Sequence, residues 1–331
     1  MGLQKTLSVD WLQGTFPHDR VDSLVDLLKV LLGEDGERME HGQYRYNRSV
    51  SWVGCGVRVL FDNDDARARD IHGGRAAVVL PGGALGGLDA VALQSMLKTL
   101  VSDYWFKATR VDLAWDDYTR RITPSDVCVE ADKGNYSRFR SHRHILERSR
   151  GGEVTGDTVY FGARGKNGGG RFLRCYDKGL ESDGRINAIR WECEFSKEKA
   201  AQVVFALYQT ESLEEFCAVI GAYVGGCVDF VERRTEGKLR GAERLEWWQG
   251  IVDSLGESRL RNERRVRSVE GTRKWVRAAV FPSLKVLREA LGSVEWEEFL
   301  LDVKHVAIRG YQKAMVSDYR ARRGVAEHVS L

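Results

Sequence analysis

Charged and apolar residues alternate along several short runs in the middle of the chain. The alternation is clearest in RVDLAWDD (Arg110 to Asp117) and RWECEF (Arg190 to Phe195). Two more runs, TVYFGAR (Thr158 to Arg164) and RCYDK (Arg174 to Lys178), also have the composition of strands. Successive side chains of a strand point to opposite faces. The four runs therefore predict one sheet with a charged face and an apolar face.

The rest of the chain adds strands and helices before these runs and mainly helices after them. Hydrophobic periodicity predicts strands at 7–16, 45–61 and 76–80, and helices at 21–32, 89–105, 196–208, 212–224, 283–291 and 294–320. We therefore expect an α+β protein with a large curved antiparallel sheet, helices on one face and a helical C-terminal region. The change of character predicts two parts, 1–240 and 241–331.

Positive charge is concentrated in two stretches of the chain. The 331 residues are 43% hydrophobic and 30% charged with a net charge of +3, which is typical of a globular protein and excludes a histone-like polycation. Residues 131–150 contain six Lys/Arg against two acids, and residues 259–277 contain eight against two. Either stretch suits a phosphate backbone, and a solvated helix face or loop is an equally open interpretation. The candidate DNA contacts of the second stretch are Arg259, Arg261, Arg264, Arg265, Arg267 and Lys274.

The cysteines and the hydrophobic runs indicate where the protein acts. The six cysteines include no CxxC pair and no zinc-like spacing, which favours reduced thiols. No run approaches the roughly 18–20 apolar residues that a membrane span needs, and no apolar signal segment is present at the N-terminus. We therefore expect a cytoplasmic protein that does not bind membranes.

Two pairs of acids lie on the predicted charged face. Asp112 and Asp116 are four residues apart, about 13 Å along a flat strand, with apolar residues on the opposite face. Glu192 and Glu194 are two residues apart, about 7 Å. If the strands are neighbours, these carboxylates form an oxygen-ligand site suited to Mg²⁺ or Mn²⁺. The alternative for Asp112 and Asp116 is an edge strand whose polar face is solvated.

Tyr176 lies between Arg174 and Lys178 on one face of its predicted strand. A phenol has a pKa near 10, so it is a poor nucleophile at neutral pH unless nearby cations or a metal favour the phenolate. Together with the acids, this pattern predicts a tyrosine that attacks a phosphodiester. Tyr160 is a second candidate for the nucleophile, and an ordinary tyrosine of the sheet is the plain alternative.

Further cations and two histidines accompany these strands. Arg164, at the end of one strand, and Arg190, beside the glutamates, are candidate contacts to DNA phosphates. His142 and His144 form an HxH pattern similar to the two-histidine metal motif of many nicking enzymes. Their context, SRFRSHRHILERSR, is basic and predicts a flexible segment. Contact with a DNA backbone, or a solvated loop, is therefore favoured over a metal site.

Four segments, in this order and spacing, resemble the rolling-circle replication initiators of the Rep_trans type, whose relatives include phage initiators and mobile-element relaxases. They are SVDWLQGTF, TRVDLAWDD, YFGARGKNGGGRFLRCYDK and RWECEF, and they span roughly residues 7–200. The RxYxK element is the most specific of these features. The resemblance implies that Tyr176 is the nucleophile and that Asp112, Asp116, Glu192 and Glu194 occupy the acidic positions of the family.

The resemblance also implies an activity. Members of this family nick one strand at an origin hairpin, form a 5′-phosphotyrosyl bond, act as homodimers and engage a host helicase. We therefore expect residues 1–240 to be a nicking and strand-transfer domain that uses Mg²⁺ or Mn²⁺, and residues 241–331 to recognise origin DNA. Two alternatives stay open: a conjugative relaxase with the same chemistry, and a non-catalytic origin-binding regulator.

Overall fold

The structure is a computed structural model that describes residues 6–165, 169–232, 242–256, 269–308, 313, 316–317 and 319–321. The chain divides into two compact units, residues 1–260 and 261–331. All strands of the described residues lie in the first unit, whereas the described part of the second unit is helical. The candidate chemistry of the sheet therefore belongs to the first unit.

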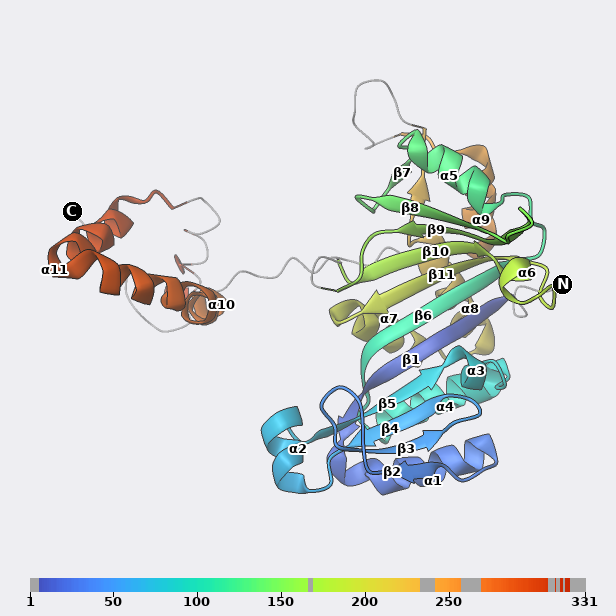
Figure 1. Cartoon of the computed structure of the whole chain (residues 1–331), viewed down its shortest axis with the longest axis horizontal. Helices are drawn as coiled ribbons and strands as arrows, with labels where there is room; N and C mark the ends of the chain where they lie inside the picture. Colours follow the sequence, from blue (N-terminus) through green and yellow to red (C-terminus); the bar gives the residue numbers. More distant parts are fainter. Residues whose placement is uncertain are drawn as a thin grey trace. The chain divides into compact units, whose positions relative to one another are not determined.

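The first unit is built on one ten-stranded antiparallel sheet (Figure 1). Its strands, in spatial order, are β2 (Glu37–Met39), β3 (Arg48–Trp52), β4 (Val57–Phe61), β5 (Arg75–Pro81), β1 (Leu7–Pro17), β6 (Lys107–Asp117), β11 (Ile189–Ser196), β10 (Arg171–Asp177), β9 (Val154–Phe161) and β8 (His142–Arg148). A second, two-stranded sheet pairs β7 (Tyr136–Ser137) with β12 (Asp229–Phe230). The predicted large antiparallel sheet is confirmed.

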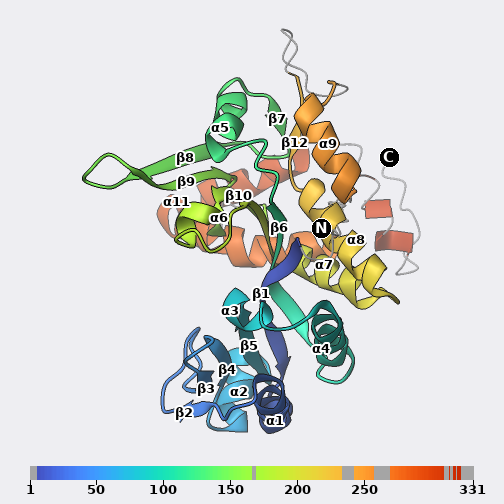
Figure 2. The ribbon, with the colours of Figure 1, turned by 90° about the vertical axis from the view of Figure 1, so that its right-hand side faces the viewer.

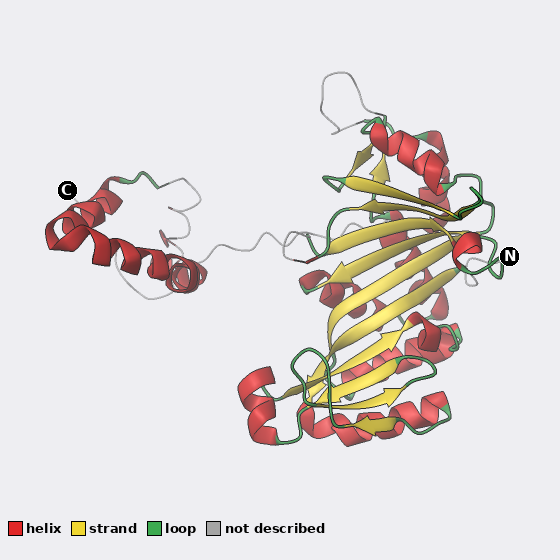
Figure 3. Cartoon of the chain, in the orientation of Figure 1, coloured by secondary structure: helices red, strands yellow, loops and turns green. Residues whose placement is uncertain are grey.

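Helices cover the apolar face of this sheet (Figures 2 and 3). Near its centre α7 (Glu198–Tyr208) and α8 (Leu213–Gly225) pack against β6 and β11, and at one end α5 (Pro124–Asp132) packs against β8 and β9. Leu113, Trp191 and Phe161 are among the side chains buried under these helices. Burying one such side chain stabilises a fold by roughly 1.5–3 kcal/mol. The other helices of the unit are η2 (His18–Arg20), α1 (Val21–Leu32), α2 (Asp65–His72), α3 (Gly82–Leu85), α4 (Ala90–Ser102), α6 (Lys178–Glu181) and α9 (Glu246–Leu255).

Helix ends in this unit follow the signals in the sequence. Asp89 accepts the N–H of Ala92 at the start of α4, as an N-cap residue does. Gly33 ends α1 in the left-handed conformation, with φ 73°. At the start of α5, Thr123 and Asp126 form a reciprocal capping box. Within the described residues, no helix is long and apolar enough to cross a membrane.

The predicted strand through Lys178 is one residue too long. β10 ends at Asp177, and Lys178 is the first residue of α6. The reason is local, because the carboxylate of Asp177 accepts the N–H groups of Gly179 and Leu180 and so starts a helix. Lys178 therefore lies just beyond the end of the strand, two residues after Tyr176.

The prediction of a flexible segment around the two histidines is also wrong. His142 and His144 lie in β8, the last strand of the sheet. Their imidazoles are held by carboxylates, with His142 Nε2 2.9 Å from Oδ1 of Asp132 and His144 Nε2 2.7 Å from Oδ1 of Asp157. These hydrogen bonds, together with strand pairing to β9, hold the basic sequence in a strand.

The two compact units divide between residues 260 and 261, and the functional division at 240/241 stays a prediction. Helix α9 belongs to the first unit, because Trp248 and Val252 are buried in its core. The second unit contains α10 (Val269–Trp275), η4 (Val276–Val280) and α11 (Phe281–His305). Inside α11, Gly292 has non-helical backbone angles, next to the predicted break between two helices. The assignment of DNA recognition to the C-terminal part stays a prediction.

Candidate active site on the charged face of the sheet

Strand register brings the predicted residues together on one face of the sheet. β11 lies between β6 and β10, so side chains from three strands meet there. Residues directly opposite each other in antiparallel strands have Cβ atoms about 4.5–5.5 Å apart. The opposed pairs on this face are Asp112 with Glu194, Asp116 with Arg190, Glu192 with Arg174, and Arg190 with Tyr176.

Tyr176 contacts a buried carboxylate and two cations. Its hydroxyl donates a hydrogen bond to Oε2 of Glu192 at 3.3 Å, and Glu192 is only 1% exposed. The other oxygen of that carboxylate, Oε1, accepts from Arg174. Arg174 Cζ and Lys178 Nζ lie 6.0 and 5.7 Å from the centre of the tyrosine ring. The geometry therefore places a tyrosine between two cations with a proton acceptor at its hydroxyl.

The surroundings of Tyr176 keep its hydroxyl protonated. Burial, the largest cause, raises the pKa of Tyr176 to about 12. The positive charges of Arg190 and Arg174 lower this pKa only in part. The negative charges of Asp10 and Glu181 raise it further. The cations favour the phenolate, as the sequence suggested, but burial outweighs them, so attack by this oxygen requires a group that takes its proton.

Arg190 is the centre of a buried ion-pair network beside the tyrosine. Its guanidinium binds Asp116 through two nitrogens, at 2.6 and 2.8 Å, and Asp10 through a third at 2.9 Å. Arg190 and Asp116 are both 8% exposed. A bidentate pair of this kind fixes both side chains in one geometry. Asp116, predicted as a metal ligand, is thus paired with an arginine in the structure.

Asp112 and Glu194 share one cationic nitrogen. Nη2 of Arg110 lies 2.5 Å from Oδ2 of Asp112 and 3.2 Å from Oε2 of Glu194. Asp112 is 1% exposed, and burial raises the pKa of its carboxyl although the Arg110 hydrogen bonds lower it. Arg164, 49% exposed, binds the same oxygen of Glu194 at 2.8 Å. Two carboxylates thus converge on a point of positive charge.

This convergence fits a divalent cation by its chemistry. Both donors are carboxylate oxygens, the ligands that Mg²⁺ and Mn²⁺ prefer, and a positively charged nitrogen of Arg110 already lies between them. Glu192 and Asp116 have other partners, namely Arg174 with Tyr176 and Arg190. Asp112 and Glu194 are therefore the acids of this face best placed to hold such an ion together.

Tyr160 lies on the same face but in different surroundings. It is opposite Arg174 on β9. Its ring stacks on the ring of Phe172, with ring centres 5.6 Å apart. Arg143, which lies opposite Tyr160 on the neighbouring strand β8, places its guanidinium carbon 5.0 Å from the centre of the Tyr160 ring. These are packing contacts with an aromatic ring and a cation. The contact with a carboxylate belongs to Tyr176, which therefore has the stronger geometry for a nucleophile.

Sequence reasoning missed two residues of this site. Arg110, the first residue of the RVDLAWDD run, bridges Asp112 and Glu194. Its position two residues before Asp112 places both side chains on the same face of the strand, which is a signal that the sequence contained. Asp10 had no such signal. The register between β1 and β6 shifts between Val9 and Trp11, so the intervening Asp10 escapes the simple alternation and reaches Arg190.

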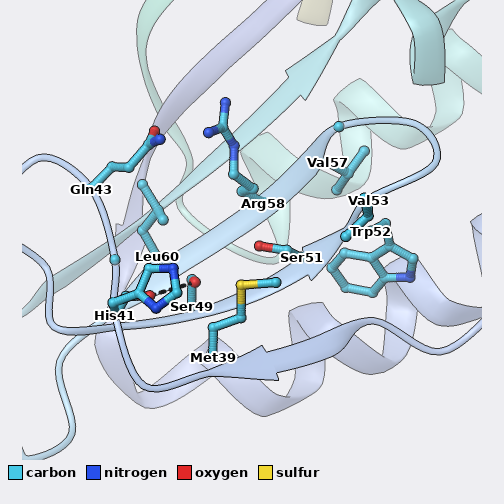
Figure 4. A pocket seen from close by; sticks show the side chains of 12 residues that line it. Met39, His41, Gln43, Ser49, Ser51, Trp52, Val53, Val57, Arg58 and Leu60 are labelled. Atoms are coloured by element: carbon cyan, nitrogen blue, oxygen red, sulfur yellow. Dashed lines mark hydrogen bonds between the residues drawn. The ribbon is translucent and has the colours of Figure 1, made fainter.

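A pocket of about 410 Å³ opens on the same face at the far end of the sheet (Figure 4). Register carries the charged face from Asp112 through Trp11 on β1 to Arg58 and Ser51 on β4 and β3, which line the pocket. Figure 4 shows His41 beside Ser49, whose hydroxyl donates to the His41 carbonyl oxygen at 2.7 Å. The charged face thus continues into a hollow with both polar and apolar walls.

The side chains of the predicted C-terminal DNA contacts lie outside the part of the chain that the structure describes. Lys274 lies in α10, but its side chain is outside the described part of the chain. The remaining candidates are outside the described residues altogether: Arg259, Arg261, Arg264, Arg265 and Arg267. Their role in binding DNA stays a prediction.

Comparison with known families identifies the group to which these residues belong. The model of the Rep_trans family, described as replication initiation factor, matches residues 106–302, more than half of the chain. The chain belongs to the Rep_trans family. The matched region runs from the start of β6 into α11 and includes Tyr160, Tyr176, the four predicted acids and the arginines around them, so the candidate site apart from Asp10 lies inside the matched region.

Two individual proteins resemble the Rep_trans chain described here. A Bacillus subtilis (strain 168) protein named "Putative DNA relaxase NicK" is 24% identical over 226 residues, which are 64% of this chain and 62% of the relative. The alignment thus spans less than two thirds of that relative's length. The solved structure of a rolling circle replication initiator protein from Geobacillus stearothermophilus has a TM-score of 0.59 and 23% identity, covering 76% of this chain and 97% of the other. The latter comparison shows a shared fold.

Proposed function

We propose that this Rep_trans protein starts rolling-circle replication by nicking one DNA strand at a specific origin, with Tyr176 as the nucleophile. The observation that supports this most strongly is the hydrogen bond from the Tyr176 hydroxyl to Glu192, with the cations of Arg174 and Lys178 at 6.0 and 5.7 Å from the centre of the ring. A nucleophile, a proton acceptor and charges for a phosphate are the groups that this reaction needs.

The chemical step uses Glu192 as the base. Oε2 of Glu192 takes the phenolic proton as the Tyr176 oxygen forms a bond to phosphorus. The bond between phosphorus and the 3′ oxygen breaks, and that oxygen takes up a proton. Tyr176 then carries the 5′ phosphate, and a free 3′-OH is left to prime synthesis. At termination a 3′-OH attacks the phosphotyrosine, the tyrosine recovers its proton, and the strand is rejoined.

Positively charged side chains hold the phosphate during this step. Arg174 and Lys178 lie beside the tyrosine ring and exchange their carboxylate partners, Glu192 and Glu181, for phosphate oxygens. Arg190 is buried and saturated by Asp116 and Asp10, so it acts through its charge and its fixed position beside Tyr176. Arg164 is exposed enough to reach the strand next to the scissile phosphate.

We further propose that Asp112 and Glu194 hold Mg²⁺ or Mn²⁺ in place of the Arg110 nitrogen. When bound, such an ion polarises a phosphoryl oxygen and offsets the charge that develops on it. The sequence also predicted Glu192 and Asp116 as ligands. Their contacts favour other roles, with Glu192 on the nucleophile and Asp116 on Arg190.

The partners follow from the same proposal. Single-stranded or hairpin origin DNA binds along the charged face, where the pocket lined by Arg58, Ser49 and Ser51 offers room for a nucleotide away from the nick. The arginine-rich stretch at 259–277 binds duplex DNA. A host helicase and a homodimer are carried over from the family resemblance, and action in the cytoplasm is carried over from the cysteine pattern that favours reduced thiols.

A conjugative relaxase is the second candidate, because the Bacillus subtilis relative carries the word relaxase in its name. The chemistry would be the same and the DNA different. A relaxase would nick a transfer origin, whereas a replication initiator would nick a replication origin. The two candidates therefore differ in the DNA sequence that is nicked and not in the residue that attacks.

The test is formation of a covalent protein–DNA adduct. Full-length protein is incubated with Mn²⁺ and labelled single-stranded hairpins taken from DNA flanking its own gene, and the products are separated on a denaturing protein gel. We expect a slower labelled band that chelator abolishes. Tight binding to a hairpin without any adduct would contradict the proposal and favour a non-catalytic origin-binding regulator.

A further inference from the structure

A second group of potential metal ligands lies on the other face of the sheet. Cys128 and Asp132 are four residues apart on α5, which places them on one side of the helix. His142, the first residue of β8, faces them. Cys128 Sγ is 3.6 Å from Oδ2 of Asp132, and His142 Nε2 is 2.9 Å from Oδ1. One ligand atom from each of the three residues lies within 4.8 Å of the other two.

We propose that Cys128, Asp132 and His142 bind a Zn²⁺ ion. A thiolate, an imidazole nitrogen and a carboxylate oxygen are the donors that zinc prefers, whereas Mg²⁺ avoids sulfur and nitrogen. Zn–ligand distances of about 2.0–2.3 Å put the donors of a tetrahedral site about 3.3–3.8 Å apart. The Cys128–Asp132 spacing of 3.6 Å falls in this range, and the His142–Asp132 spacing of 2.9 Å is about 0.4 Å shorter. Asp132 is 68% exposed, which leaves a path for the ion from solvent.

Outer contacts already orient the histidine for this role. Nε2 of His142 faces the other two donors, and Nδ1 lies 3.3 Å from the hydroxyl of Tyr136. A histidine that binds a metal through one nitrogen usually engages a polar partner through the other. His144 lies two residues along the same face of β8, held by Asp157, and is a candidate for a fourth ligand.

This site is separate from the proposed nicking centre. His142 and His144 lie opposite Phe161 and Val159, whose side chains are buried in the apolar core. Tyr176 lies opposite Thr158, which is on the other face. A Zn²⁺ ion here would join α5 to β8, the edge strand of the sheet, so its role is structural, and it differs in donor chemistry from the ion proposed at Asp112 and Glu194.

The test is metal binding by the full-length protein under reducing conditions, after treatment with chelator. Zn²⁺ is titrated in excess Mg²⁺, which occupies oxygen-only sites, and Co²⁺ serves as a probe because a thiolate ligand gives it a charge-transfer absorption band. We expect one Zn²⁺ per chain and a Co²⁺–thiolate band. Cys128→Ser should abolish the band and weaken Zn²⁺ binding by more than the roughly 10- to 100-fold that loss of an outer partner costs.

Matched variants make the outcome specific. Cys55→Ser removes another partly exposed cysteine and should leave the band and the affinity unchanged. Asp132→Asn changes an exposed side chain and should weaken Zn²⁺ binding while the circular dichroism spectrum stays that of the unaltered protein. The proposal would be overturned if the unaltered protein bound no Zn²⁺. It would also be overturned if Cys128→Ser and Asp132→Asn both bound Zn²⁺ as tightly as the unaltered protein does. The adduct assay with Tyr176 is independent of either result.

Discussion

The hydroxyl of Tyr176 on β10 donates a hydrogen bond to Oε2 of Glu192 on the neighbouring strand β11, at 3.3 Å. Both residues are largely removed from solvent, and burial raises the pKa of the phenol to about 12. At neutral pH the oxygen therefore carries its proton until a base removes it, and Glu192 is the carboxylate in contact with it. The pair connects the fold to the proposed chemistry, because it exists only if β10 and β11 are in this register.

We predict that Glu192→Gln slows nicking by about 100-fold or more, the effect typical of removing a general base. The amide keeps the size of the side chain but cannot take a proton from Tyr176. The measurement is single-turnover cleavage of a labelled origin hairpin, with binding of the same hairpin measured in parallel. Glu214→Gln, an exposed change on α8, is the control. An unchanged rate in Glu192→Gln would contradict the role given to this carboxylate.

The buried pair of Arg190 and Asp116 should matter for stability. Removing one partner of a buried ion pair leaves an uncompensated charge and costs about 3–5 kcal/mol. Asp10 still pairs with Arg190 in the Asp116→Asn variant. We therefore expect this substitution to lower the free energy of unfolding by about 3 kcal/mol, the lower end of that range, as measured by denaturant titration. Asp22→Asn breaks the exposed pair with Arg38 and should cost less than about 1 kcal/mol. Equal effects of the two substitutions would show that the Arg190 network does not stabilise the site.

Much of the fold could be predicted because it follows from local periodicity. Alternation in RVDLAWDD and RWECEF correctly indicated strands with one charged and one apolar face, and the buried Leu113 and Trp191 confirm the apolar side. The helix predicted at 21–32 has the same bounds as α1, and the helix predicted at 89–105 contains α4. These features depend only on residues near each other in the chain, which is why the sequence alone is informative about them.

The partners of the charged groups could not be predicted, because they depend on pairing between distant segments. Periodicity placed Glu192 on the right face but could not show whether Arg174, Arg190 or Arg110 would bind it. The bulge at Asp10 shifts the register of β1 and brings an unforeseen acid to Arg190. The end of β10 at Asp177 and the strand structure around His142 were missed for the same reason: individual side-chain contacts override the local sequence pattern there.

Acid should weaken the contact that ends β10. Burial alone would raise the pKa of Asp177, but hydrogen bonds from Arg120 and from the Leu180 and Gly179 amides outweigh it and hold the pKa below its usual value. A lowered pKa in the folded state contributes stability above the unfolded pKa of about 3.9, and this stability is lost as the pH falls through the folded value. We expect Asp177→Asn to cost about 1 kcal/mol at pH 7 and progressively less below about pH 4.

The measurement is the free energy of unfolding of Asp177→Asn and of the unaltered protein, at pH 7 and at pH 3. The substitution keeps a side chain that caps a helix, so the comparison isolates the charge. A difference between the two proteins that stays constant or grows on acidification would contradict the assignment.

Salt dependence should reveal whether the arginine-rich stretch binds DNA. Each phosphate contact contributes about 0.9 to the slope of log K against log salt for duplex DNA. We predict that replacing Arg261, Arg264 and Arg265 together by Gln in the full chain lowers the slope for origin duplex by about 2–3 and leaves cleavage of a single-stranded hairpin unchanged. Fluorescence anisotropy at several salt concentrations gives the slope. An unchanged slope would rule out phosphate contacts at these positions.

The central claim is that Tyr176, and not Tyr160, becomes linked to DNA. The two tyrosines lie on the same face of the sheet, but only Tyr176 donates to a carboxylate among the contacts of the described residues. The direct measurement compares Tyr176→Phe with Tyr160→Phe in the adduct assay with Mn²⁺ and maps the linked peptide of the unaltered protein by mass spectrometry. We expect DNA on the peptide containing Tyr176, no adduct from Tyr176→Phe and normal adduct from Tyr160→Phe. An adduct that survives Tyr176→Phe, or that maps to Tyr160, would contradict it.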